Sequence, residues 1–135
     1  MVGLNPSPFQ LVIADDNERF RDTLAELFCP YFEITQVGTG QDVVDYVSQE
    51  KVHLALLDYE MPELSGIEAA IELKEQHDTP SILLTARNLE TIPIPQPMPM
   101  FRVFNKPVRR RELFGCVQEV MTSCYGIASL LPNGN

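Results

Sequence analysis

The sequence predicts an α/β fold: a doubly wound, five-stranded parallel sheet with helices on both faces. Short apolar runs alternate along the 135 residues with stretches whose apolar residues recur every three or four positions. Buried parallel strands read as continuous apolar runs, and amphipathic helices provide the crossovers between them. The expected strands are the apolar runs 11–14, 32–37, 52–57, 81–84 and 101–104.

Apolar spacing and capping signals define the helices between these strands. The first helix carries apolar residues at i, i+4, i+7 and i+8 from Phe20, and Pro30 ends it. Thr39 can cap the second helix, and Ser65 with Glu68 has the capping-box spacing at the start of the third. A last helix is expected from a final apolar stripe, formed by Leu113, Cys116, Val117, Val120 and Met121.

The segment between the fourth and fifth strands breaks this alternation. Residues 92–100 place proline at every second position. Each proline removes a backbone donor and disfavours helix at the residue before it. At most residues 88–91 can form a single turn, so the fourth helix is expected to be short or replaced by an extended, proline-rich loop.

Length and composition restrict the function classes. A chain of 135 residues is expected to form one domain, and its net charge of −9 argues against nucleic acid or an anionic membrane as a direct partner. Three cysteines without metal-ligand spacing indicate free thiols in a reducing, cytoplasmic setting. We expect a flexible leader at 1–9, a domain at 10–122, and a tail or the start of a linker at 123–135.

Polar side chains follow four of the predicted strands. Asp15 and Asp16 follow the first strand, Asp58 the third, Thr85 the fourth and Lys106 the fifth. The carboxyl ends of parallel strands share one sheet edge, where ligands bind in open α/β folds. Alone, the first two aspartates would also fit a helix N-cap. Converging carboxylates, a hydroxyl and an ammonium together predict a magnesium-dependent phosphoryl-transfer site with an aspartate nucleophile.

These residues also carry a family resemblance. The sequence resembles a response-regulator receiver domain, the CheY-like fold of two-component signalling, over about residues 10–121. The resemblance implies the sheet order 2-1-3-4-5. The matching motifs are Val12-Ile13-Ala14-Asp15-Asp16, Leu56-Leu57-Asp58-Tyr59-Glu60-Met61-Pro62 with Gly66 following, Leu83-Leu84-Thr85-Ala86, and Lys106-Pro107.

The resemblance implies a phosphoacceptor and a metal site. Asp58 would accept a phosphoryl group from a sensor histidine kinase or a phosphotransfer protein. Asp15, Asp16 and Asp58 would hold Mg²⁺ or Mn²⁺, directly or through water. The backbone carbonyl of Glu60 would complete the protein ligands.

The resemblance also assigns roles around the phosphoacceptor. Thr85 would be the switch hydroxyl, and Lys106 would contact the phosphoryl group and form a cis peptide bond with Pro107. Glu60 and Arg87 each lie two residues beyond a site residue, at positions that in the family tune water access to the phosphoryl group. We expect both side chains to modulate dephosphorylation.

Two features depart from the family pattern. Receivers usually carry Tyr or Phe three residues before the lysine, where this chain has Val103. Phe101 and Phe104 flank this position, but if the strand register is as expected, they point the opposite way from Val103 or lie one step out from it. The second departure is the proline-rich replacement of the fourth helix, on the face where most receivers dimerise or contact their output.

The leading interpretation is a regulatory module that assists its own phosphoryl transfer and is not a turnover enzyme. Its output would be another protein or an effector domain outside this chain, and the resemblance also allows a homodimer. One alternative is a receiver-like interaction scaffold that is not phosphorylated. Another is a magnesium-dependent phosphohydrolase with an aspartyl-phosphate intermediate. Such enzymes need an acidic residue two positions after Asp15, where this chain has Asn17.

Overall fold

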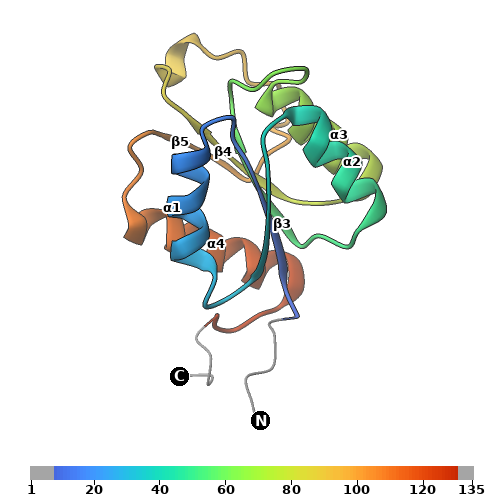
Figure 1. The fold of residues 1–135 in the computed structure, drawn as a ribbon, viewed down its shortest axis with the longest axis vertical. Helices are drawn as coiled ribbons and strands as arrows, with labels where there is room; N and C mark the ends of the chain where they lie inside the picture. The colour runs from blue at the N-terminus through green and yellow to red at the C-terminus, as the bar shows by residue number, and fades with distance from the viewer. Residues whose placement is uncertain (1–7, 131–135) are drawn as a thin grey trace.

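The sheet has the predicted composition and strand order. The structure, a computed structural model, describes residues 8–130. All five strands are parallel and lie in the order β2-β1-β3-β4-β5, which confirms the fold class (Figure 1). The strands are β1 (Gln10–Ala14), β2 (Glu33–Val37), β3 (Leu54–Asp58), β4 (Ser81–Thr85) and β5 (Arg102–Asn105).

Two helices cover each face of the sheet. α1 (Glu18–Phe28) and α4 (Arg110–Tyr125) pack on one face, and α2 (Gly40–Gln49) and α3 (Gly66–His77) pack on the other (Figure 1). Successive strand residues face opposite sides, and this alternation divides the apolar core into two clusters. From β1, Leu11 and Ile13 join the α1/α4 cluster, and Val12 and Ala14 join the α2/α3 cluster.

Side-chain caps begin the first three helices, and those at Thr39 and Ser65 are the predicted ones. Asn17 Oδ1 accepts the backbone N–H of Phe20 at 3.0 Å and begins α1, so the cap lies just after the aspartate pair. Thr39 caps α2 through its hydroxyl. Ser65 and Glu68 form the predicted reciprocal capping box at the start of α3. These caps satisfy orphan amides and set where each helix leaves the sheet edge.

The connection between β4 and β5 lacks a regular helix, as the proline spacing predicts. It contains a short 3₁₀ helix, η1 (Leu89–Thr91), capped by Asn88, followed by an extended connector. The fourth α-helix in chain order is therefore α4, which follows β5. The connector turns its aliphatic side chains inward, because Ile92 and Met100 are buried in the α2/α3 cluster while the prolines between them are exposed or half-buried.

The domain extends beyond the boundary that we expected at residue 122. α4 continues to Tyr125, and Leu130 is buried in the α1/α4 cluster. The Leu130 N–H donates to Gln118 Oε1 at 2.8 Å, which ties the segment after α4 back to that helix. The rest of the expected leader and tail, residues 1–7 and 131–135, lies outside the described residues. None of the helices in the described range is both long and apolar enough to span a membrane.

Candidate functional site

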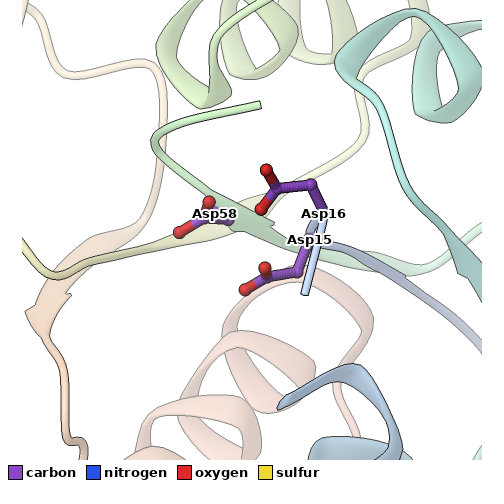
Figure 2. Close-up of side chains that lie close together, drawn as sticks. All are labelled: Asp15, Asp16 and Asp58. Atoms are coloured by element: carbon purple, nitrogen blue, oxygen red, sulfur yellow. The ribbon is translucent and has the colours of Figure 1, made fainter. Parts of the chain in front are cut away.

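Three carboxylates converge at the carboxyl edge of the sheet. Asp15 and Asp16 directly follow β1, and Asp58 is the last residue of β3, the strand beside it. One oxygen from each carboxylate lies within 4.8 Å of the other two. Figure 2 shows the three carboxyl groups gathered at this edge. Asp15 and Asp58 are buried and Asp16 is exposed, so the cluster opens to solvent on one side.

Lys106 joins two of these carboxylates from the end of β5. Its Nζ donates to Asp15 Oδ2 at 2.8 Å and to Asp58 Oδ1 at 2.9 Å. The same ammonium lies 4.2 Å from the centre of the Phe20 ring, within the range of a cation–π contact. The peptide bond from Lys106 to Pro107 is cis, as expected. The ammonium therefore occupies a fixed position beside the expected phosphoacceptor.

The loop after β3 is held tightly against Asp58. A Cβ on Gly66 would lie 2.2 Å from the Asp58 carbonyl oxygen, so a larger residue does not fit without backbone movement. The Gly66 N–H donates to the Tyr59 carbonyl, and the Tyr59 N–H donates to the Leu84 carbonyl, both at 2.9 Å. These contacts explain why the motif around Asp58 includes a glycine at this spacing.

Burial raises the pKa of Asp58 from its ordinary 3.8 to about 6. The hydrogen bond from Lys106 lowers this pKa, but the neighbouring charges of Asp15 and Asp16 raise it further. Burial lowers the pKa of Lys106, yet its hydrogen bonds to the two carboxylates outweigh burial and raise it above its ordinary value. An ionised Asp58 in this setting gains from any added cation.

Thr85 ends β4 at the same edge and is fully buried. It follows Leu84, which is the register partner of Asp58 in the sheet. The Thr85 Oγ1 accepts the Arg87 N–H at 3.0 Å, an arrangement that leaves the hydroxyl hydrogen to be donated elsewhere. The Thr85 carbonyl accepts the Lys106 N–H at 2.7 Å, so the expected switch hydroxyl and the lysine share a backbone hydrogen bond.

Glu60 and Arg87 form an ion pair beside the acidic cluster. The Glu60 Oε2 to Arg87 Nη2 distance is 2.6 Å, and both side chains are about half exposed. The hydrogen bond from Arg87 lowers the pKa of Glu60. The Arg87 guanidinium also lies 5.7 Å from the centre of the Tyr59 ring. The two expected modulators thus contact each other and connect the loops that follow β3 and β4.

Val103 lies apart from these contacts. It packs in the α2/α3 cluster, while Phe104 packs against the α1/α4 cluster on the opposite face, as the register predicts. Phe101 precedes β5 and also packs on the α1/α4 side. Neither aromatic ring occupies the position of Val103 on its face of the sheet.

Sequence reasoning did not identify two side chains that contact this site. The helical spacing predicts Phe20 only as part of an apolar stripe, but its ring lies against Lys106. Asn105 donates its side-chain amide to the carbonyls of Thr85 and Arg87. The only signal for Asn105 was its place at the end of a strand, directly before the lysine.

The donor set fits a hard divalent cation. The three clustered carboxylates supply only oxygen ligands, and their negative charge exceeds the single positive charge of Lys106. Mg²⁺ takes one or two carboxylates, keeps several waters and completes its coordination with phosphate oxygens. The exposed side of the cluster, at Asp16, leaves room for such additional ligands.

The chain resembles known signalling proteins in sequence and in fold. The transcriptional regulatory protein SrrA of Staphylococcus aureus is 36% identical over 83 residues, which are 61% of this chain and 34% of SrrA. The chain thus spans about a third of the length of this curated relative.

Solved structures share the fold at lower identity. A CheY-like response regulator receiver domain protein from Methanospirillum hungatei JF-1 superposes with a TM-score of 0.77 at 22% identity, covering 87% of this chain and 96% of that one. The receiver domain of sensor histidine kinase PA1611 from Pseudomonas aeruginosa PAO1, solved with a magnesium ion in its active-site cleft, gives a TM-score of 0.72 at 22% identity and covers 84% and 97%. The family model described as response regulator receiver domain matches residues 11–118, and this chain therefore belongs to the response regulator receiver domain family.

Proposed function

We propose that Asp58 accepts a phosphoryl group from a sensor histidine kinase or a phosphotransfer protein, and that the aspartyl phosphate switches a protein–protein interaction surface. The observation that carries this proposal is the position of the Asp58 carboxylate. It lies in a cluster of three carboxylates while its Oδ1 accepts a hydrogen bond from Lys106 at 2.9 Å. This arrangement places a nucleophilic oxygen beside a fixed positive charge.

The transfer needs little beyond positioning and charge stabilisation. A carboxylate oxygen of Asp58 attacks phosphorus and forms the acyl-phosphate bond, while the bond to the donor breaks and the donor keeps its electron pair. The Lys106 ammonium offsets negative charge on the transferring oxygens. The Thr85 hydroxyl donates a hydrogen bond to one of those oxygens.

The reaction depends on a divalent cation, Mg²⁺ or Mn²⁺. Asp15, Asp16 and Asp58 would hold it together with the backbone carbonyl of Glu60. When bound, the cation neutralises charge between the carboxylates and the phosphoryl oxygens. The oxygen-only donor set supports this assignment, as does the magnesium ion in the similarly folded PA1611 receiver domain.

Glu60 and Arg87 modulate dephosphorylation. Both side chains are solvent-exposed and lie on the loops that follow β3 and β4, the strands that end at Asp58 and Thr85, which supports a role in controlling the access of water. Replacing either side chain with alanine changes the access of water and therefore the lifetime of the aspartyl phosphate. Equal lifetimes in the wild type and in the Glu60→Ala and Arg87→Ala variants would remove this role.

The output is regulatory, through protein contact and without turnover of a substrate. The partner is either a separate output protein or an effector domain outside this chain, and SrrA is by its name a transcriptional regulator. Self-association is a second form that the output could take. A cytoplasmic site of action agrees with this role, and the acidic chain is not expected to bind nucleic acid or membrane directly.

Intact-mass spectrometry tests the proposal. The protein is incubated with acetyl phosphate, with and without Mg²⁺, as wild type and as Asp58→Asn. We expect a gain of one phosphoryl group that needs Mg²⁺ and is absent from the variant. If no adduct appears and beryllofluoride also fails to bind, the phosphorylation proposal is wrong, and the unphosphorylated scaffold becomes the better account.

A further inference from the structure

The side chain of Asn105 links the ends of two neighbouring strands. Asn105 is the last residue of β5 and the register partner of Thr85, the last residue of β4. Its Nδ2 lies 2.5 Å from the Arg87 carbonyl oxygen and 3.3 Å from the Thr85 carbonyl oxygen. An amide nitrogen carries two hydrogens, so both are used on this one turn. The side chain is exposed, and these hydrogen bonds rather than core packing hold it in place.

The turn that Asn105 holds also positions the Thr85 hydroxyl. The Arg87 carbonyl accepts from Asn105, and the Arg87 N–H donates to Thr85 Oγ1 at 3.0 Å. Both the N–H and the carbonyl of Arg87 are therefore hydrogen-bonded to side chains. Because the N–H of Arg87 fills an acceptor site of the hydroxyl, it sets the direction in which the hydroxyl hydrogen can be donated.

The same turn carries the Arg87 side chain toward the end of β3. Its guanidinium pairs with Glu60 at 2.6 Å and lies over the ring of Tyr59, the residue after Asp58. A continuous series of contacts thus runs from Asn105 through Arg87 to the loop beside the phosphoacceptor. Lys106, the neighbour of Asn105, closes this series by binding Asp58 directly.

No other residue of β5 makes a comparable contact. Val103 has no hydrogen-bonding side chain and packs in the α2/α3 cluster. Arg102 is the first residue of β5, and its guanidinium bonds Glu119 on α4. Within residues 8–130, Asn105 is the β5 residue whose side chain bonds the turn at 85–87.

We propose that Asn105 is a positioning residue for phosphorylation, which acts by holding the turn at 85–87 so that the Thr85 hydroxyl faces the transferring phosphoryl group. The inference rests on the function proposed above and extends it. The coupling between β4 and β5 that this chain lacks at Val103 passes instead through the side-chain amide of Asn105.

A double-mutant cycle measures whether Asn105 acts through Thr85. The rate constant for phosphorylation by acetyl phosphate is measured at saturating Mg²⁺ for wild type, Asn105→Ala, Thr85→Ala and the double variant. We expect Asn105→Ala to lower the rate constant about tenfold in the wild type and less than about twofold in the Thr85→Ala background. An unchanged rate, or an equal fall in both backgrounds, overturns the proposal.

Two matched variants distinguish this role from a non-specific structural effect of substitution in β5. Asn105→Asp keeps the size of the side chain but replaces the donor nitrogen with an oxygen, and it should slow phosphorylation as much as Asn105→Ala. Arg102→Ala removes an exposed side-chain hydrogen bond from the same strand and should leave the rate unchanged. A normal rate in Asn105→Asp overturns the role of the amide hydrogens.

Amide hydrogen exchange tests the positioning without any phosphorylation. In the wild type, the Arg87 N–H is bonded to Thr85 Oγ1 and should be protected. Protection should be lost in Asn105→Ala and kept in Arg102→Ala. Undiminished protection in Asn105→Ala overturns the inference. If the wild type takes no phosphoryl group at all, the proposed function fails, and the exchange result still decides whether Asn105 holds Thr85.

Discussion

Replacing Asp58 with asparagine should stabilise the metal-free protein at pH 7. Burial and the neighbouring carboxylates raise the pKa of Asp58 from 3.8 to about 6. Each pKa unit corresponds to about 1.36 kcal/mol, so ionising Asp58 in the folded state costs about 1.36 × (6 − 3.8), or 3 kcal/mol. Asparagine carries no charge and keeps an oxygen that can accept the hydrogen bond from Lys106. We therefore expect a gain approaching 3 kcal/mol.

The gain should depend on pH in a defined direction. The folded-state pKa of Asp58 lies above its unfolded value, so the folded protein binds more protons between pH 3.8 and about 6. Wild-type stability therefore falls as pH rises through this window, and the variant does not share that fall. The difference between the two proteins should be full above about pH 6 and should vanish below pH 3.8.

Urea unfolding in the presence of a chelator measures this difference. With a slope of about 2 kcal/mol per M, the Asp58→Asn midpoint should lie about 1.5 M above wild type at pH 7. Asp22→Asn removes an exposed carboxylate from α1 and should change stability by less than about 0.5 kcal/mol. A midpoint that is unchanged or lower at pH 7, or a gain equally large below pH 3.8, refutes the reasoning.

Three further predictions concern the packing and charge of the domain. Gly66→Ala places a Cβ 2.2 Å from the Asp58 carbonyl oxygen and should lower the free energy of unfolding by about 2 kcal/mol. Gly115→Ala, on an open helix surface, should raise it by up to about 1 kcal/mol. Equal midpoints of urea unfolding in the two variants would contradict this. Lys106→Met removes a hydrogen bond that lowers the pKa of Asp58, so this pKa should rise further, and an unchanged NMR titration would exclude that. Burial lowers the pKa of His53, whose Nδ1 accepts a backbone N–H of β1, so stability should be full above pH 6.5 and fall below it. The test uses the Asp58→Asn background, because titration of the Asp58 carboxyl changes stability in the opposite direction. A stability that does not change with pH in that background would be inconsistent with a neutral His53.

Features that depend on short segments of sequence were predictable. The capping box of Ser65 and Glu68 begins a helix because both side chains bond amides within one turn. The proline spacing of 92–100 prevents a helix through the same local chemistry. The convergence of Asp15 and Asp58 needed only one additional rule, that parallel strands end at a common edge.

Features that depend on side chains meeting across the fold were not predictable. Phe20 fits an apolar helical stripe equally well whether its ring lies in the core or against Lys106. The roles of Asn105 and Leu130 depend on distances to residues far along the chain. The expected third strand begins at residue 52, but β3 begins at Leu54, the first of its residues with a register partner in β1.

Direct localisation of the phosphoryl group tests the central claim that Asp58 is the phosphoacceptor. The protein is phosphorylated with acetyl phosphate and Mg²⁺, and the acyl phosphate is reduced with borohydride, which converts a phosphorylated aspartate to homoserine. Peptide mass spectrometry then locates the homoserine. The account predicts homoserine at residue 58 and at neither Asp15 nor Asp16. Homoserine at another position, or none in a protein that carries the adduct, would contradict the assignment of Asp58.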